Sequence, residues 1–187
     1  NFFTLEDIEE KGFDLLAFRL LVLQSHYRTD AHFSWDNLQS AQNRLNELRA
    51  WADLRHQPST DSMSDELNEM WDKTLKDMKK CLMNDLDTPG ALAALAKQVS
   101  YMMTNPIPRH NDSNTGTALA QIDEMLGLSL DNRPDITEAQ KTLIKKRQTA
   151  KADMDYKTAD QIRDDLSSQG IAIRDTDYGQ IWSRINS

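Results

Sequence analysis

Hydrophobic residues recur every three or four positions through most of this chain, which is the spacing of one face of an α-helix. One stripe follows Ser34, a residue type common at helix N-caps, and comprises Trp35, Leu38, Ala41, Leu45, Leu48 and Trp51. A second stripe follows Ser64 and comprises Leu67, Met70, Trp71, Leu75, Met78 and Leu82. Each stripe predicts a long amphipathic helix with one buried face.

Shorter helices are predicted before the first stripe. Thr4 and Asp7 have the spacing of a capping box, and Gly12 ends the helix that they open. Asp14 caps a second helix that runs to about Tyr27. Because apolar residues cover nearly every face of this second helix, we expect it at the centre of the fold.

Two more helices are predicted after the second stripe. Thr88 and Pro89 open a helix to about Met103, because proline at the first helical position loses no hydrogen bond. A shorter helix runs from about Thr117 to Gly127. Polar or proline-containing breakers predict loops at residues 57–62, 105–108 and 111–116.

The pattern changes near the end of the chain. Thr137 and Gln140 form a capping box for one helix, and a further helix begins at Asp155 or Thr158 and ends at Gly170. Alternating apolar residues then flank an Asp-Tyr-Gly turn and predict a β-hairpin; they are Ile171, Ile173, Ile181 and Ile185. We therefore predict a mainly α fold. An antiparallel helical bundle spans residues 1–128, a linker spans 129–136, and a small helical domain closing with a short β-hairpin spans 137–187.

Composition excludes several classes of protein. No apolar run approaches the roughly 20 residues that cross a bilayer, so we expect no contact with a membrane. Cys81 is the single cysteine, which excludes an internal disulfide and a cysteine-rich zinc site. The four histidines lack the spacing of metal ligands, so we predict no metal site. A reducing, cytoplasmic setting is the simpler inference.

Catalytic motifs are also missing from the sequence, which has neither a glycine-rich phosphate loop nor a nucleophile elbow. We interpret His26 as structural and Cys81 as a core residue rather than a nucleophile. No catalytic residue is therefore predicted.

Charge is unevenly distributed along the chain, although its net value is −8. Residues 139–187 hold nine basic and seven acidic side chains, and the basic ones concentrate in an acid-free stretch containing Lys141, Lys145, Lys146, Arg147 and Lys151. Such a row of cations suits a phosphate backbone, or else forms an ordinary solvated helix face. Three nearby aromatic residues could stack on unpaired bases or belong to the core of a small domain; they are Tyr156, Tyr178 and Trp182.

Six motifs carry a family resemblance. In chain order they are Asn1-Phe2-Phe3-Thr4-Leu5, Asp14-Leu15-Leu16-Ala17-Phe18-Arg19, Ser25-His26-Tyr27-Arg28, Asp85-Leu86-Asp87-Thr88-Pro89-Gly90-Ala91-Leu92, Ala159-Asp160-Gln161-Ile162-Arg163-Asp164, and Gly170-Ile171 with Asp175, Gly179 and Trp182. Collinear over essentially the whole chain, they resemble the C-terminal region of bacterial-type cysteinyl-tRNA synthetases. The second motif is similar to the D-x-x-A-x-R stretch of the DALR anticodon-binding bundles.

The resemblance implies a parent enzyme, a class I cysteine–tRNA ligase. Its catalytic domain, with ATP and zinc, would precede Asn1, so the present chain alone would hold no cofactor and be inactive. The bundle would contact the inner face of cysteine tRNA, and the small C-terminal domain would read the anticodon. Positions matching the family's anticodon contacts are Lys151, Tyr156, Asp160 and Asp175; Lys141, Lys145, Lys146 and Arg147 would contact the tRNA backbone.

Alternatives remain open for individual residues and for the whole chain. Lys151 stands where the family often has arginine, so it keeps the charge but lacks the bidentate fork. Asp160 could simply pair with Arg163 or Lys157, and Asp175 could cap a turn. The whole chain could instead belong to a related cysteine:aminosugar ligase, or be a helical module that docks other proteins. We expect a monomer in the cytoplasm that binds cysteine tRNA and not DNA.

Overall fold

The fold was analysed in a computed structural model that describes residues 3–30, 32–57, 65–104, 113–176 and 179–185. Six helices form a bundle: α1 (Leu5–Glu10), α2 (Leu15–Leu23), α3 (Trp35–Ala52), α4 (Asp65–Met83), α5 (Thr88–Thr104) and α6 (Ser113–Leu126). A 3₁₀ helix, η1 (Asp53–His56), follows α3. The remaining elements are α7 (Glu138–Ala152), α8 (Tyr156–Ser168) and the strands β1 (Ile171–Thr176) and β2 (Gly179–Arg184). The predicted fold, mainly helical with a closing hairpin, is confirmed.

Helix starts follow the capping residues that the sequence predicts. Thr4 and Thr137 each form a complete capping box, with Asp7 and Gln140 respectively. Three other predicted caps accept a backbone hydrogen bond through their side chains; they are Asp14, Ser34 and Asp155. Each cap satisfies an amide that the first helical turn leaves without a partner.

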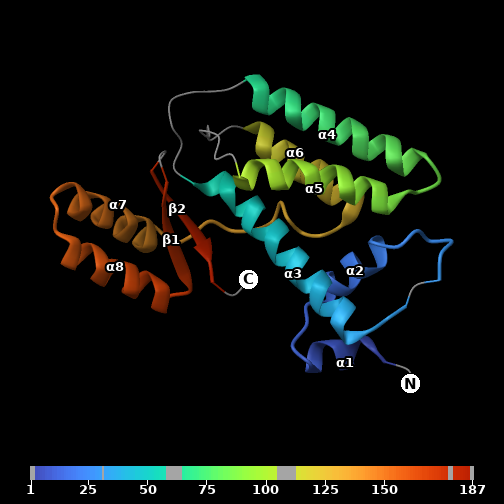
Figure 1. The fold of residues 1–187 in the computed structure, drawn as a ribbon, viewed down its shortest axis with the longest axis horizontal. Coiled ribbons are helices and arrows are strands. Elements are labelled where there is room, and N and C mark those ends of the chain that lie inside the picture. The colour runs from blue at the N-terminus through green and yellow to red at the C-terminus, as the bar shows by residue number, and fades with distance from the viewer. Residues whose placement is uncertain (1–2, 31, 58–64, 105–112, 177–178, 186–187) are drawn as a thin grey trace.

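Helix α2 differs from its prediction in length and in position. It ends at Leu23 rather than near Tyr27, and only Ala17 and Leu20 on it are buried, whereas Val22 is 53% exposed. It packs on α3 at the edge of the bundle (Figure 1), not at its centre. Apolar residues on every face therefore do not specify a central position: α2 contacts α1, α3 and α5, yet it still leaves Val22 exposed to solvent.

Helix α6 also differs from its prediction, because it begins at Ser113, four residues before the expected start at Thr117. Gly116 lies inside the helix, where glycine costs only about 1 kcal/mol relative to alanine. The predicted loops at residues 58–62, 105–108 and 111–112, and the turn residues Asp177 and Tyr178, lie outside the described residues.

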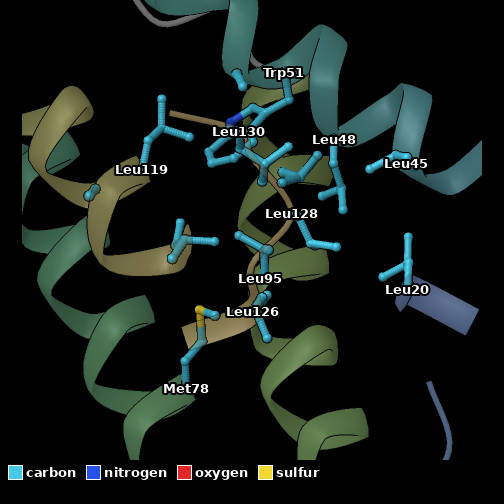
Figure 2. Packing of buried hydrophobic residues seen from close by; sticks show 14 of the residues in the cluster. Leu20, Leu45, Leu48, Trp51, Met78, Leu95, Leu119, Leu126, Leu128 and Leu130 are labelled. Atoms are coloured by element: carbon cyan, nitrogen blue, oxygen red, sulfur yellow. The ribbon is translucent and has the colours of Figure 1, made fainter. Parts of the chain in front are cut away.

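The bundle core is built mainly of leucine, with Trp51 and Met78 among the buried residues (Figure 2). Within it lie Leu128 and Leu130, which follow α6 and are fully buried. Gly127 makes the turn that directs them inward, with a φ of 64°. A Cβ at this position would lie 2.7 Å from Nη2 of Arg19, so any side chain here would require the Arg19 guanidinium to shift. The start of the segment that joins the bundle to α7 is therefore part of the bundle core.

A second, smaller core lies between α7, α8 and the hairpin. Its buried members are Ile136, Ile144, Leu166, Ile171 and Trp182. The two strands are antiparallel, with Ile173 opposite Trp182. In Figure 1 this part lies to one side of the bundle, and α3 extends from α1 and α2 toward it.

Gln57, just after η1, joins the two parts through the backbone of β2. Its Nε2 donates to the carbonyl oxygen of Trp182, and its Oε1 accepts from the amide of Trp182, both at 2.9 Å. The side-chain amide thus pairs with the outer edge of β2 in the way that a neighbouring strand would. Ile181 on the same strand packs against the bundle core.

The burial of Leu130 generates a prediction about stability. Replacing Leu130 with alanine should lower the free energy of unfolding by about 2–5 kcal/mol, because it removes a fully buried leucine and leaves a cavity. Urea denaturation followed by tryptophan fluorescence measures the change. Leu5→Ala, at a position 53% exposed, is the control and should change stability by about 0.5 kcal/mol or less. Equal effects at both positions would contradict the packing described above.

Candidate nucleic-acid interface

Arg147 and Lys151 lie one turn apart on α7, and both contact Asp175 of β1. Nη1 and Nη2 of Arg147 donate to Oδ1 and Oδ2 of Asp175 at 2.9 Å and 3.0 Å. Nζ of Lys151 lies 2.8 Å from Oδ2 of the same carboxylate. We call these three residues the Asp175 triad. Arg147 and Lys151 can reach the same carboxylate because residues four apart on a helix share one face.

The triad combines a buried cation with a partly exposed anion. The side chain of Arg147 is 6% exposed, whereas that of Asp175 is 44% exposed. The Arg147 guanidinium holds the pKa of Asp175 well below its usual range; burial opposes this shift, and the Lys151 ammonium lowers the pKa further. Asp175 is therefore a fixed, ionised acceptor at the surface, with lone pairs left for a further donor.

The other predicted backbone-binding cations differ in their surroundings. Nζ of Lys141 lies 2.6 Å from Asp135 and 2.8 Å from Glu138, and hydrogen bonds to these carboxylates raise the pKa of Lys141. Lys145 and Lys146 are exposed and form no ion pair with any residue that the structure describes. Within the basic stretch, these two lysines are therefore the cations available to a phosphate.

Helix α8 presents the remaining predicted anticodon contacts on one face. Tyr156 begins the helix and is 62% exposed, and Asp160 follows one turn later. Asp160 lies 3.2 Å from Nη1 of Arg163, the pairing that the sequence left open as its structural alternative. With side chains 61% and 50% exposed, this pair is worth at most about 1 kcal/mol, so it opposes another contact only weakly.

The aromatic residues near the basic helix have separate environments. Trp182 is 3% exposed and belongs to the small core, so it offers no ring to a base. Tyr156 is exposed, and Tyr178 lies outside the described residues. Asp155 caps α8 only four residues after Lys151, so Lys151 and Tyr156 lie at the same end of the α7–α8 pair.

Arg147, predicted to contact the tRNA backbone, instead points inward in the structure and binds Asp175. The spacing of residues on α7 already indicated that Arg147 would point inward. Arg147 shares the buried face of α7 with Ile144 and Ala150, and an arginine on such a face needs an acid partner. The strand that follows supplies Asp175.

Among the described residues, no group of histidine, cysteine, aspartate and glutamate side chains could hold a metal ion. None of the helices that the structure describes is long and apolar enough to span a membrane.

Comparisons with known proteins give one family. Residues 133–182 match the family described as cysteinyl-tRNA ligase anticodon binding domain. The chain is 31% identical to cysteine–tRNA ligase of Chlamydia muridarum over 199 residues, covering 99% of this chain and 42% of the relative. It is 32% identical to the enzyme of Finegoldia magna, covering 100% and 41%, and 30% identical to that of Bacillus pumilus, covering 98% and 41%. The chain thus spans about two fifths of the length of these relatives.

The triad generates a prediction about titration. Asp175 should remain ionised at pH values where an ordinary aspartate, with a pKa of 3.8, is protonated. Since its pKa is lowered in the folded state, its ion pairs stabilise the protein fully above about pH 4, and this contribution is lost progressively as the pH falls from there through the lowered value. The chemical shift of its carboxyl carbon during an acid titration reports the pKa.

Matched variants separate the effect of the Arg147 contact on the pKa of Asp175 from that of positive charge in general. Arg147→Gln should raise the pKa of Asp175 toward 3.8, whereas Lys145→Gln, which removes a cation without a contact to Asp175, should leave it unchanged. An unperturbed titration of Asp175 in the unsubstituted protein would contradict the triad.

Proposed function

Since this chain corresponds to the C-terminal region of a cysteine–tRNA ligase, we propose that it binds the tRNA of that enzyme and reads its anticodon. The whole protein would attach cysteine to this tRNA with the use of ATP, and its ATP and zinc sites would lie outside the present chain. In this proposal, residues 1–128 form the bundle that meets the tRNA, residues 129–136 connect it to the next part, and residues 137–187 recognise the anticodon.

The observation that carries the proposal is the carboxylate of Asp175. It lies within the matched anticodon-binding family and is held by Arg147 and Lys151 while 44% exposed. A fixed carboxylate accepts from the N–H edge of guanine or from an exocyclic amine of cytosine or adenine. Because Arg147 fixes both oxygens, little side-chain freedom remains to be lost on binding.

Tyr156 and Asp160 extend this surface along α8. An exposed tyrosine ring gives an unstacked base a platform worth roughly 1–3 kcal/mol. Asp160, one turn away, supplies a second carboxylate acceptor on the same helix face. Lys151 contributes one cation beside Asp175, although a lysine lacks the two-pronged geometry of arginine.

The phosphate contacts are assigned to the exposed part of the basic helix. Lys145 and Lys146 are exposed and pair with no acid among the described residues, and Lys141 is shared with Asp135 and Glu138. Arg147 acts through Asp175 rather than on a phosphate directly. Such contacts supply affinity without regard to sequence, because the phosphate is the same at every nucleotide.

The alternative functions have less support. A related cysteine:aminosugar ligase has no use for an RNA-reading tail, whereas the family match covers that tail. A protein-docking module would place its methionines on one exposed surface. Met78 and Met102 are instead buried in the bundle core, and Met83 and Met154, which are exposed, lie on α4 and after α7. We propose further that the protein acts in the cytoplasm as a monomer and binds neither membranes nor DNA.

Anticodon preference is the direct test of the proposal. The chain should bind cysteine tRNA more tightly than the same tRNA with a changed anticodon, measured at low salt. Asp175→Asn and Asp160→Asn should each remove about 1–3 kcal/mol of this preference, because an amide presents different hydrogen-bonding groups to a base edge. Asp165→Asn, on another face of α8, is the matched control and should keep the preference. Binding that ignores the anticodon would overturn the assignment.

Salt dependence tests the phosphate contacts separately. Lys145→Gln and Lys146→Gln should each reduce the slope of log affinity against log salt concentration by about one, equally for both anticodons. Lys73→Gln, at an exposed position of α4, is the control for loss of charge far from α7. A slope unchanged by the α7 substitutions would show that these lysines do not meet phosphates.

A further inference from the structure

A buried carboxylate connects three distant segments of the chain. Asp53 directly follows α3 as the first residue of η1 and is 1% exposed. Nε and Nη2 of Arg133 donate to its two oxygens at 2.8 Å and 2.7 Å, and Nη1 of Arg184 donates to Oδ2 at 2.6 Å. Arg133 belongs to the segment before α7, and Arg184 ends β2. We call these three residues the Asp53 cluster.

Backbone contacts extend the cluster on both sides. Nη2 of Arg184 donates to the carbonyl oxygen of Pro134 at 2.7 Å. Arg55, two residues after Asp53, donates to Asp131 Oδ1 at 2.9 Å and to the carbonyl oxygen of Arg133 at 2.8 Å. The segment that joins the bundle to α7 is thereby held along residues 131–134 and does not act as a free linker.

The cost of burying the Asp53 carboxylate favours one orientation of the hairpin relative to η1. A carboxylate removed from water is tolerated only where charged partners replace its hydration, and here two guanidinium groups do so. If the hairpin moved away from η1, Asp53 would lose Arg184, and the remaining buried charges would be left without full compensation. A change of orientation therefore costs more than the hydrogen bonds alone.

We propose that Asp53 is a positioning residue, which fixes the anticodon-reading part on the bundle so that both meet one tRNA at the same time. This inference rests on the proposed function. It adds that Asp53 keeps the two tRNA-contacting surfaces at a fixed separation. Two linked surfaces bind a common partner more tightly when their separation matches the span of the two sites. Asp53 touches neither the Asp175 triad nor Tyr156, so its effect on RNA is exerted through orientation.

The test compares two RNAs that need different parts of the protein. The isolated anticodon stem–loop needs only the C-terminal part, whereas whole cysteine tRNA meets both surfaces. Asp53→Asn should weaken binding of the whole tRNA by about 10-fold or more and that of the stem–loop by less than about 2-fold. Gln57→Ala, which keeps the charges and removes two hydrogen bonds to Trp182, should shift binding in the same direction by less.

Leu95→Ala controls for lost stability, because Leu95 is fully buried in the bundle core and takes no part in the Asp53 cluster. If it reproduces the selective loss of whole-tRNA binding, or if Asp53→Asn weakens both RNAs equally, Asp53 has no positioning role. Asp53→Glu keeps the charge and should restore part of the whole-tRNA affinity.

A measurement without RNA separates failure of this inference from failure of the proposed function. Backbone ¹⁵N relaxation should show the bundle and residues 137–185 tumbling together in the unsubstituted protein and with distinct correlation times in Asp53→Asn. Common tumbling in Asp53→Asn would overturn the positioning role even if anticodon preference is found. Distinct tumbling with no RNA bound by the unsubstituted chain would leave Asp53 as an orienting residue and overturn the tRNA assignment.

Discussion

The geometry of this protein depends most on the buried charge of Asp53. Hydrophobic burial accounts for each core separately, but it specifies direction poorly, since apolar contacts of similar area can form in many orientations. The carboxylate of Asp53 accepts from one arginine before α7 and another at the end of β2, and each guanidinium has fixed donor directions. The bundle, the connecting segment and the hairpin are thus held at one mutual angle by groups that satisfy one another only there.

The Asp175 triad applies the same chemistry with a different result. Asp53 is buried, so its carboxylate is fully occupied by partners within the protein. Asp175 is partly exposed, so its carboxylate can still accept a hydrogen bond from a donor outside the protein. Arg147 and Lys151 hold Asp175 in place, and this pairing leaves less of their positive charge available to a ligand. The basic helix therefore offers fewer free cations than its sequence suggests, and in return it presents one acceptor of fixed direction. Under the proposed function, the helix would give up some affinity for phosphates and gain the ability to distinguish bases.

Local features of the fold were predictable from sequence, and features that depend on distant partners were not. Capping residues such as Asp14 and Thr137 act within one helical turn, and the stripe from Leu38 to Trp51 reports one buried face, so these predictions are confirmed. The position of α2 depends on which helices surround it, and residues 129–136 read as a polar linker although Leu130 is buried. For the site, the family resemblance implied Lys151 and Asp175. The inward direction of Arg147 and the role of Asp53 depend on partners 28 and 80 residues away.

The contact between Gln57 and Trp182 has a consequence for self-association. A two-stranded ribbon has two outer edges whose backbone groups can recruit a strand from another molecule, and such pairing is a common start of aggregation. On the outer edge of β2, the amide and carbonyl of Trp182 are the middle pair of that edge, and Gln57 occupies both. An incoming strand would have to displace a side chain that is 6% exposed. Gln57, which joins the two parts of the chain, therefore also keeps the edge of β2 from pairing with strands of other molecules in a crowded solution.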